Sequence, residues 1–270
     1  MICVQNINKY FHRGSVNEVH GIRDLSIDIE QGDFITIIGS NGAGKSTFLS
    51  CLAGTHAVNS GTIGVHGTDV THWPEYKRAR LIGRVFQDPL KGTCANGTIA
   101  QNMALALKRG KPRGLGRGVK VTDLDLFRRR LQVLGLGLES RLRDRVGLLS
   151  GGQRQALTMV MATLVRPDLL LLDEHTAALD PKTAAQMLEL TRTIVTDNGL
   201  TTLMVTHNMH QALNLGNRLI MMHQGRIILD ARADEKSSLT VEALLHKFHT
   251  QGEGDISDRM LLNTSRPMHA

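Results

Sequence analysis

The chain has 270 residues, of which 41% are hydrophobic and 3% aromatic, and its formal net charge is +7 at pH 7. This length and hydrophobicity exclude a disordered polymer and suit one domain with a subdomain. No uncharged apolar run approaches the roughly 20 residues that a membrane-spanning helix needs, and the first residues lack the apolar core of a secretory signal. Cys3, Cys51 and Cys94 have neither disulfide nor metal-ligand spacing, so we expect a reduced, cytosolic protein.

Apolar stretches predict the strands of an α/β protein. Ile22–Glu30 alternates apolar and polar side chains, as a half-exposed antiparallel strand does. Phe34–Gly39 and Leu169–Asp173 are continuously apolar, which is typical of buried parallel strands. Thr201–Thr206 and Arg218–Met222 predict further core strands. Amphipathic helices alternate with these strands, as in an α/β fold with a parallel-sheet core.

The stretch GSNGAGKST follows the strand at Phe34–Gly39 and opens a helix, which is the setting of a phosphate-binding loop (P-loop). Glycines let backbone N–H groups surround the β-phosphate of a nucleotide, Lys45 reaches the β- and γ-phosphates, and the Ser46 hydroxyl can bind Mg²⁺. The alternative is a glycine-rich turn with a chance Lys-Ser pair. The predicted nucleotide-binding residues of this loop are Gly39, Ser40, Asn41, Gly42, Ala43, Gly44, Lys45, Ser46 and Thr47.

Two features follow before the next strand. Gln87 comes directly after the strand-like run LIGRVF and is either a solvated loop residue or part of the site. Only helical patterns occur between Thr98 and Val165, so we expect a helical subdomain over about residues 88–165.

A basic segment, residues 108–120, interrupts that helical stretch. Its six charges account for all but about one of the net positive charges, and aromatic residues are scarce, so we do not expect nucleic acid as a partner. Four glycines and Pro112 predict a flexible insertion that is either solvated or placed against an anionic surface. The charged residues are Lys108, Arg109, Lys111, Arg113, Arg117 and Lys120.

The stretch LSGGQ, Leu149 to Gln153, directly precedes a long apolar-periodic helix. A serine and two glycines there predict a bare helix start, whose unpaired backbone N–H groups and positive dipole end favour an anion. We therefore expect a phosphate at this point.

Acidic residues end the strand at Leu169–Asp173. Asp173 stands at the carboxyl edge, where an α/β site holds its metal, and Glu174 could act as general base toward water. The alternative is that either residue caps the next helix. His207 follows another strand in the same way, and its alternative is a helix cap or a surface position.

The ordered set of P-loop, Gln87, LSGGQ, the acidic strand end, ALD ending at Asp180, and His207 resembles the ATPase subunit of an ATP-binding cassette (ABC) transporter. The resemblance covers about residues 1–248. It implies an α/β P-loop NTPase fold of the ABC ATPase type: a RecA-like parallel-sheet core, an antiparallel β subdomain and a helical subdomain. We expect this domain over residues 1–250 and a polar, flexible tail over 251–270.

The resemblance also implies a head-to-tail dimer of two copies with two ATP between them. In that arrangement the LSGGQ stretch of one copy caps the γ-phosphate of ATP that is held by the P-loop of the second copy. The residues implied in this contact are Ser150, Gly151, Gly152 and Gln153.

Further roles are implied position by position. Phe11 resembles the aromatic residue that stacks on adenine, and Tyr10 is the alternative candidate. Either side chain could instead only pack within its strand. Gln87 resembles the glutamine that senses Mg²⁺, and Asp173 the carboxylate that binds it. His207 resembles the residue that holds the γ-phosphate and positions the catalytic Glu174, while Asp180 resembles the acid that signals across the dimer.

Two positions depart from the family pattern. His175 stands where most relatives have proline, and we expect it to give the backbone after Glu174 more freedom. Ala178 stands where most have serine, which removes a hydroxyl near the partner's site.

The sequence stretches DEHTAALDPKTA, VNEVHGI and VFQDPLKGT are most similar to those of a bacterial ABC ATPase subgroup. Members of that subgroup are paired with tryptophan- or amino-acid-type substrate-binding proteins and permeases. This similarity implies an ATP-hydrolysing subunit at the cytoplasmic face of the inner membrane, bound to permease subunits and importing an amino acid or similar solute. One alternative is an exporter or lipoprotein-release ATPase. The other is a soluble ABC ATPase working on ribosomes or DNA, although the chain lacks the second cassette, coiled coils or zinc modules typical of those types.

Overall fold

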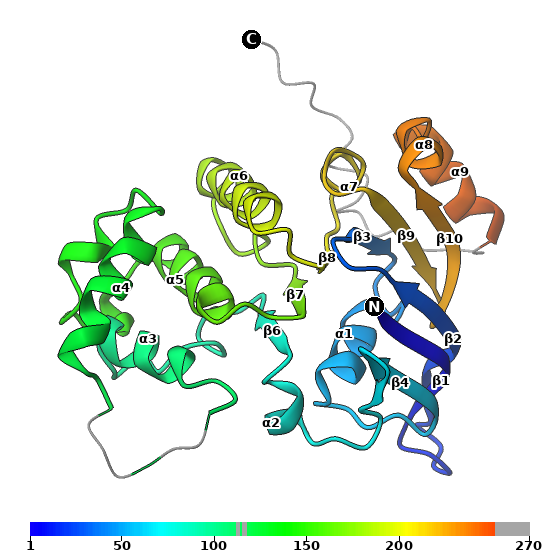
Figure 1. Cartoon of the computed structure of the whole chain (residues 1–270). Helices are drawn as coiled ribbons and strands as arrows, with labels where there is room; N and C mark the ends of the chain where they lie inside the picture. Colours follow the sequence, from blue (N-terminus) through cyan, green and yellow to red (C-terminus); the bar gives the residue numbers. More distant parts are fainter. Residues whose placement is uncertain (112–113, 115–117, 252–270) are drawn as a thin grey trace. The chain divides into compact units, whose positions relative to one another are not determined.

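The structure is a computed structural model that describes residues 1–111, 114 and 118–251 (Figure 1). The predicted C-terminal tail therefore lies outside the described residues from position 252 on, as do Arg113 and Arg117 of the basic segment. The chain divides into two compact units, Met1–Glu75 with Thr201–Ala270 and Tyr76–Leu200.

The first unit contains an antiparallel sheet with the strand order β2-β1-β4-β5. Antiparallel pairing of Ile2 with Ile29 and with Val65 joins the three long strands, and their apolar residues alternate toward the core. The predicted antiparallel strand is confirmed as part of β2, which starts earlier because Val19 pairs with the end of β1. The bounds are β1 Ile2–Phe11, β2 Val19–Ile29, β4 Ser60–Val65 and β5 Thr68–Asp69.

The same unit contains a mostly parallel set of strands in the order β10-β9-β3-β8. Strand β3 pairs in parallel with β8 on one side and β9 on the other, and all six of its residues are buried. This burial on both faces explains its continuous apolar sequence and confirms the predicted core strands. The bounds are β3 Phe34–Gly39, β8 Thr202–Val205, β9 Arg218–His223 and β10 Arg226–Arg232.

Within its described residues the first unit has four helices. Helix α1 follows β3, and α7 follows β8 and packs against β3 and α9. Buried side chains of α7, α9, β9 and β10 form one apolar cluster that includes Met209, Leu219, Leu229, Leu244 and Phe248. The bounds are α1 Lys45–Ala53, α7 Met209–Asn214, α8 Ala233–Ser237 and α9 Val241–Gln251.

The second unit pairs two parallel strands with a group of helices. Strand β6 pairs with β7, with Val85 opposite Leu172. Helices α3, α4 and α5 lie side by side in Figure 1 and contact one another. The bounds are β6 Ile82–Val85, β7 Leu169–Asp173, α3 Ile99–Leu107, α4 Val121–Gln132, α5 Gly151–Leu164 and α6 Pro181–Asp197, with 3₁₀ helices at Leu138–Ser140 and Val146–Leu148 and the short α2, Glu75–Arg78, preceding β6.

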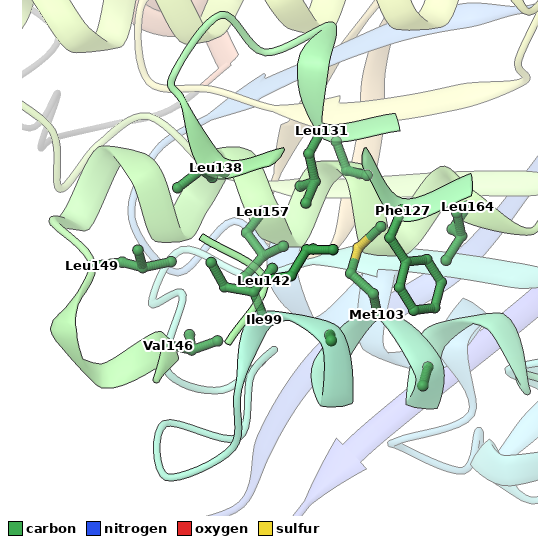
Figure 2. Packing of buried hydrophobic residues seen from close by; sticks show 13 residues of the cluster. Ile99, Met103, Phe127, Leu131, Leu138, Leu142, Val146, Leu149, Leu157 and Leu164 are labelled. Atoms are coloured by element: carbon green, nitrogen blue, oxygen red, sulfur yellow. The ribbon is translucent and has the colours of Figure 1, made fainter. Parts of the chain in front are cut away.

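An apolar core of its own holds the helical stretch together. Figure 2 shows Phe127 and Leu131 of α4 among side chains of the neighbouring helices, with Met103 from α3 and Leu157 from α5. All four are fully buried. Among the described residues the regular elements between positions 98 and 165 are helices joined by loops, apart from one isolated β-bridge between Thr98 and Arg145, and no strand interrupts them, as the sequence pattern predicts. The domain boundary near residue 88 stays a prediction.

Arg109 departs from the expected behaviour of the basic segment. Its Nη1 donates a hydrogen bond to the Ala162 carbonyl at 2.8 Å, and its Nη2 donates to the Val165 carbonyl. Burial lowers the pKa of this guanidinium. Arg109 therefore stabilises the C-terminal end of α5, where a cation is favoured, and is not one of the solvated charges that were expected.

None of the helices in the described part of the chain has the length and hydropathy that a bilayer crossing requires.

Candidate nucleotide-binding site

The predicted P-loop joins β3 to α1 and depends on its glycines. Gly42 and Gly44 have φ values of 78° and 95°, in the left-handed region that favours glycine. A Cβ on Gly44 would lie 2.5 Å from the Gly21 carbonyl oxygen, and one on Gly39 would lie 2.4 Å from the Met222 carbonyl oxygen. The loop therefore fits tightly against the neighbouring backbone.

The first turn of α1 is suited to an anion. Its N-cap, Gly44, contributes no side-chain hydrogen bond, and the first turn has no acidic residue. Lys45 is 5% exposed, and its Nζ donates to the carbonyls of Gly39 at 2.7 Å and Ser40 at 3.0 Å. Ser46 is exposed beside it. Backbone N–H groups, the helix dipole and one ammonium thus come together at this loop.

The two aromatic candidates near the end of β1 have different surroundings. The Phe11 ring covers Gly21, where an added Cβ would meet Phe11 Cε2 at 2.9 Å and Thr47 Cγ2 at 3.6 Å. The Tyr10 ring stacks on His20, with centroids 3.9 Å apart and an interplanar angle of 14°. Phe11 therefore lies near the P-loop helix, which favours it as the candidate for stacking on a base, although Lys9 Nζ stands 5.2 Å from its ring centroid.

His207 follows β8 at the same sheet edge as the P-loop. Val205 pairs with Ile37 of β3 in parallel, so both strands end on the same side. The helix after β8 is capped by Asn208, whose side chain accepts a hydrogen bond from the Gln211 N–H at 3.0 Å. The alternative of His207 as a helix cap is therefore wrong, and its predicted role at a phosphate stays a prediction.

Asp173 ends β7 in the second unit and is paired with an arginine that the sequence analysis did not single out. Arg84 Nη2 lies 3.3 Å from Asp173 Oδ2, and both side chains are 13% exposed. The same guanidinium stands 4.7 Å from the centroid of the Phe86 ring. Asp173 is thus a buried carboxylate that is paired with a guanidinium.

The donor set fits Mg²⁺ better than a metal held by protein alone. Among the described residues there is no group of three or more histidine, cysteine, aspartate or glutamate side chains that could hold a metal. Mg²⁺ commonly binds through one or two protein oxygens, with phosphates and waters completing its octahedron. Oxygen donors of that kind occur in each unit: the Ser46 hydroxyl in the first, and the Asp173 carboxylate and Gln87 amide oxygen in the second.

Gln87 is exposed at the end of β6, and β6 runs parallel to β7. Gln87 and Asp173 therefore lie at the same end of this strand pair. Gln155 of α5 is 1% exposed, and its Nε2 donates to the Phe86 carbonyl at 3.0 Å. This bond ties α5 to the residue before Gln87. A glutamine at a buried position of an apolar-periodic helix is the signal that could have identified it.

Glu174 has a backbone conformation that is unusual for its residue type. Its φ is 46°, and its carbonyl accepts a hydrogen bond from the Ala177 N–H at 3.0 Å. The cap of α6 is Asp180, which accepts from the Thr183 N–H at 3.1 Å, and hydrogen bonds from Thr183 lower the pKa of this carboxyl. The alternative that Asp173 or Glu174 caps the next helix is therefore wrong.

His175 does not loosen the backbone after Glu174 as expected. It is 1% exposed, and its Nε2 lies 2.9 Å from Thr191 Oγ1 on α6. Burial and this hydrogen bond fix the side chain, so the expectation of greater freedom is wrong. Ala178 is exposed.

The start of α5 is not bare. Ser150 Oγ accepts from the Gln153 N–H, and Gln153 Oε1 accepts from the Ser150 N–H, each at 3.2 Å, which forms a capping box. The Ser-x-x-Gln spacing of the sequence is the signal for this motif. The capping box engages two of the N–H groups that were expected to be unpaired, and the N–H groups of Gly151 and Gly152 begin the helix between them.

Gly152 also has a packing role. A Cβ on it would lie 2.4 Å from Thr183 Cγ2, whereas a Cβ on Gly151 would meet only Leu179 Cδ2 at 3.9 Å. The start of α5 is therefore close to the start of α6, which carries Asp180. The structure brings these predicted residues together within the second unit.

The predicted site residues fall into both units. The first unit holds Phe11, the P-loop and His207, and the second holds Gln87, the LSGGQ stretch, Asp173 and Glu174.

Comparisons with known proteins place this chain in a family. A family model described as "ABC transporter" matches residues 22–177, more than half of the chain. A "Tyrosine transport ATP-binding protein" of Clostridioides difficile (strain R20291) is 46% identical over 252 residues, which cover 92% of this chain and 98% of that protein. "Methionine import ATP-binding protein MetN 1" of Bacillus thuringiensis subsp. konkukian is 31% identical over 235 residues, and the match spans 86% of this chain but only 66% of that longer protein.

The fold agrees with a solved structure as well. A dimeric ATP-binding cassette in a post-hydrolysis state, MJ0796 bound to ADP and Pi, superposes with a TM-score of 0.72 at 26% identity, covering 86% of this chain and 98% of that one.

Proposed function

Because this chain belongs to the ABC transporter family as one of its ATP-hydrolysing cassettes, we propose that it drives the import of an amino acid through membrane permease subunits. The observation that carries the proposal is the 46% identity to a relative named for tyrosine transport, of which the match covers 98%. The relative named for methionine import supports the same class of solute.

In this proposal ATP binds at the P-loop, with its base against Phe11. The first turn of α1 and Lys45 neutralise the phosphates, because N–H groups and an ammonium are already directed into the loop. Mg²⁺, when bound, screens the phosphate charges and aligns the γ-phosphate. Ser46, Asp173 and Gln87 are the residues that would hold it.

Hydrolysis then depends on Glu174 and His207. Glu174 accepts a proton from the attacking water as general base, and His207 holds the γ-phosphate and orients that base. Both residues follow the carboxyl ends of strands, where the catalytic groups of open α/β sheets gather.

A second copy of the chain completes the site. The start of α5 in one copy faces the γ-phosphate in the other, with the N–H groups of Gly151 and Gly152 and the Ser150 hydroxyl as donors. The capping box orients Ser150 and Gln153 for this contact. The dimeric state of the similar cassette MJ0796 supports the association of two copies.

The further partners are membrane permease subunits and an extracytoplasmic substrate-binding protein. The cassette itself is peripheral to the cytoplasmic face of the inner membrane, and nucleic acid is not a partner.

Uptake of radiolabelled amino acids tests the proposal. Cells of the native host that lack the gene should lose uptake of one amino acid or a related group, beginning the screen with tyrosine, and the wild-type gene should restore it. A Lys45→Ala gene, expressed to the same level, should not. Unchanged uptake of every amino acid, or retention of a solute that wild-type cells release, would contradict import.

Dimerisation tests the site itself. Glu174→Gln keeps the shape of the base but removes its proton acceptor, so ATP should bind, persist and hold two chains together. Light scattering at high protein concentration should detect this dimer with ATP and not with ADP, and Ser150→Arg should abolish it. Wild-type turnover by Glu174→Gln would rule out the base, and an ATP-dependent dimer that survives Ser150→Arg would rule out the LSGGQ contact.

A further inference from the structure

The backbone at Glu174 needs support from its surroundings. A φ of 46° places Glu174 in the left-handed region, where a residue with a Cβ is strained, and such residues persist only where neighbouring structure holds them. The turn closed by the Ala177 N–H and the Glu174 carbonyl is one support, but it lies within the same short loop. A second attachment to a regular element would fix the loop more firmly.

His175 makes that attachment. It is 1% exposed, and it reaches across to Thr191, which is fully buried in the middle of α6. Thr191 Oγ1 donates its own hydrogen to the Met187 carbonyl at 2.8 Å. The same oxygen must therefore accept from His175 Nε2, which lies 2.9 Å away.

This geometry defines the protonation of the imidazole. Nε2 carries the hydrogen, and Nδ1 is a buried atom that has no hydrogen-bond partner among the described residues. A second proton would place an unsatisfied charged donor in the core. The neutral imidazole with its hydrogen on Nε2 is therefore the form that this hydrogen-bond geometry accommodates.

We propose that His175 is a positioning residue for Glu174: its hydrogen bond to Thr191 fastens the loop after β7 to α6 and so holds Glu174 in its left-handed conformation. The inference rests on the proposed function, in which Glu174 is the general base. A proline at position 175 would restrict its own φ but would have no donor to reach α6. In this chain the hydrogen bond from His175 to Thr191 therefore restricts the loop after β7, in place of a restricted backbone dihedral at position 175.

Thr191 offers a test away from the nucleotide. Thr191→Val keeps the shape of the side chain but cannot accept from Nε2, whereas Thr191→Ser keeps the hydroxyl. For ATP hydrolysis we expect Thr191→Val to lower kcat roughly tenfold with KM within about twofold, because a displaced base slows the chemical step more than binding. Thr191→Ser should retain the wild-type kcat.

Repeating the Thr191 substitution in the Glu174→Gln variant separates a positioning role of His175 from a general loss of folding. In Glu174→Gln the base is already absent, so adding Thr191→Val should not lower the residual rate further, and the ATP-dependent dimer should persist. If Thr191→Val does not fold at the assay temperature, His175→Phe replaces it, since a phenyl ring fills the space without the Nε2–H donor.

The outcomes distinguish this inference from the proposed function. A folded Thr191→Val chain with wild-type kcat, beside an inactive Glu174→Gln chain, would overturn the positioning role alone. Wild-type turnover by Glu174→Gln would overturn the base and the positioning role together. Nitrogen NMR that finds the hydrogen of His175 on Nδ1 would also overturn the inference.

Discussion

Helices α1 and α5 both begin beside glycines at a predicted phosphate contact, yet their ends are stabilised in opposite ways. Helix α1 is bounded by Gly44 and Gly54, both left-handed, and no side chain caps its start. Helix α5 begins with the Ser150 capping box and ends under the guanidinium of Arg109. Backbone geometry limits α1, whereas side chains limit α5.

The difference shows that glycines at the start of a helix do not by themselves indicate how the first turn is stabilised. At α1 the glycines allow the backbone to curve, and they leave the first turn to an anion and to Lys45. At α5 the first turn is partly satisfied by its own side chains, so the N–H groups of Gly151 and Gly152 carry the expected phosphate contact. Four substitutions test this contrast between the two helices.

Lys45→Ala should have the largest effect. It removes the cation from the open turn of α1, so ATP hydrolysis should fall by more than about 100-fold while the fold stays nearly intact. Steady-state ATPase assays and circular dichroism measure the two properties. Wild-type turnover, once contaminating ATPase is excluded, would remove the P-loop from the proposed site.

Gly152→Ala should destabilise the chain by about 1–3 kcal/mol, because the new Cβ would overlap the Thr183 methyl group. Gly151→Ala is the matched control and should be neutral or stabilising by up to about 1 kcal/mol, since alanine is the better helix former. Thr183→Ser removes that methyl group and should restore the stability of Gly152→Ala. Urea denaturation measures these differences, and equal costs at the two glycines would contradict the packing role.

Arg109→Ala should lower the free energy of unfolding by about 1–3 kcal/mol, since the carbonyls at the end of α5 lose a charged donor. Lys111→Ala, at an exposed position of the same basic segment, should change it by less than about 0.5 kcal/mol. Thermal and urea unfolding of the two variants give the comparison. Similar small changes in both would place Arg109 among the solvated charges after all.

Ser150→Ala should cost about 1 kcal/mol of stability, the usual value of a lost N-cap. Thr98→Ala is its matched control, because Thr98 forms the same kind of capping box with Gln101 at the start of α3. Both variants should lose similar stability, but only Ser150→Ala should weaken the ATP-dependent dimer of Glu174→Gln. Equal weakening by Thr98→Ala would show that the dimer responds to stability rather than to Ser150.

Local patterns predicted the strands and helices well. The continuous apolar runs of β3 and β7 predict burial on both faces, and the structure confirms it. The P-loop could also be placed from sequence, because its glycines, lysine and serine are consecutive and lie between a strand and a helix.

Contacts between distant residues could not be predicted in the same way. The Arg84–Asp173 pair depends on the register of β6 against β7, and the cap from Arg109 joins residues 53 positions apart. The attachment of His175 to α6 depends on how that helix packs. Comparing histidine with proline by residue type alone predicted more backbone freedom after Glu174, which is the opposite effect. The Ser150 capping box could have been predicted from sequence, since its Ser-x-x-Gln spacing is local.

Lys45 lies against the carbonyls of Gly39 and Ser40, so its four methylenes have few rotamers left in the folded chain. Fixing a lysine side chain costs up to about 2 kcal/mol of conformational entropy. Folding bears this loss, and an arriving nucleotide meets an ammonium whose motion is already restricted. The lysine thus shifts part of the entropic cost of recognition from the binding equilibrium to the folding equilibrium.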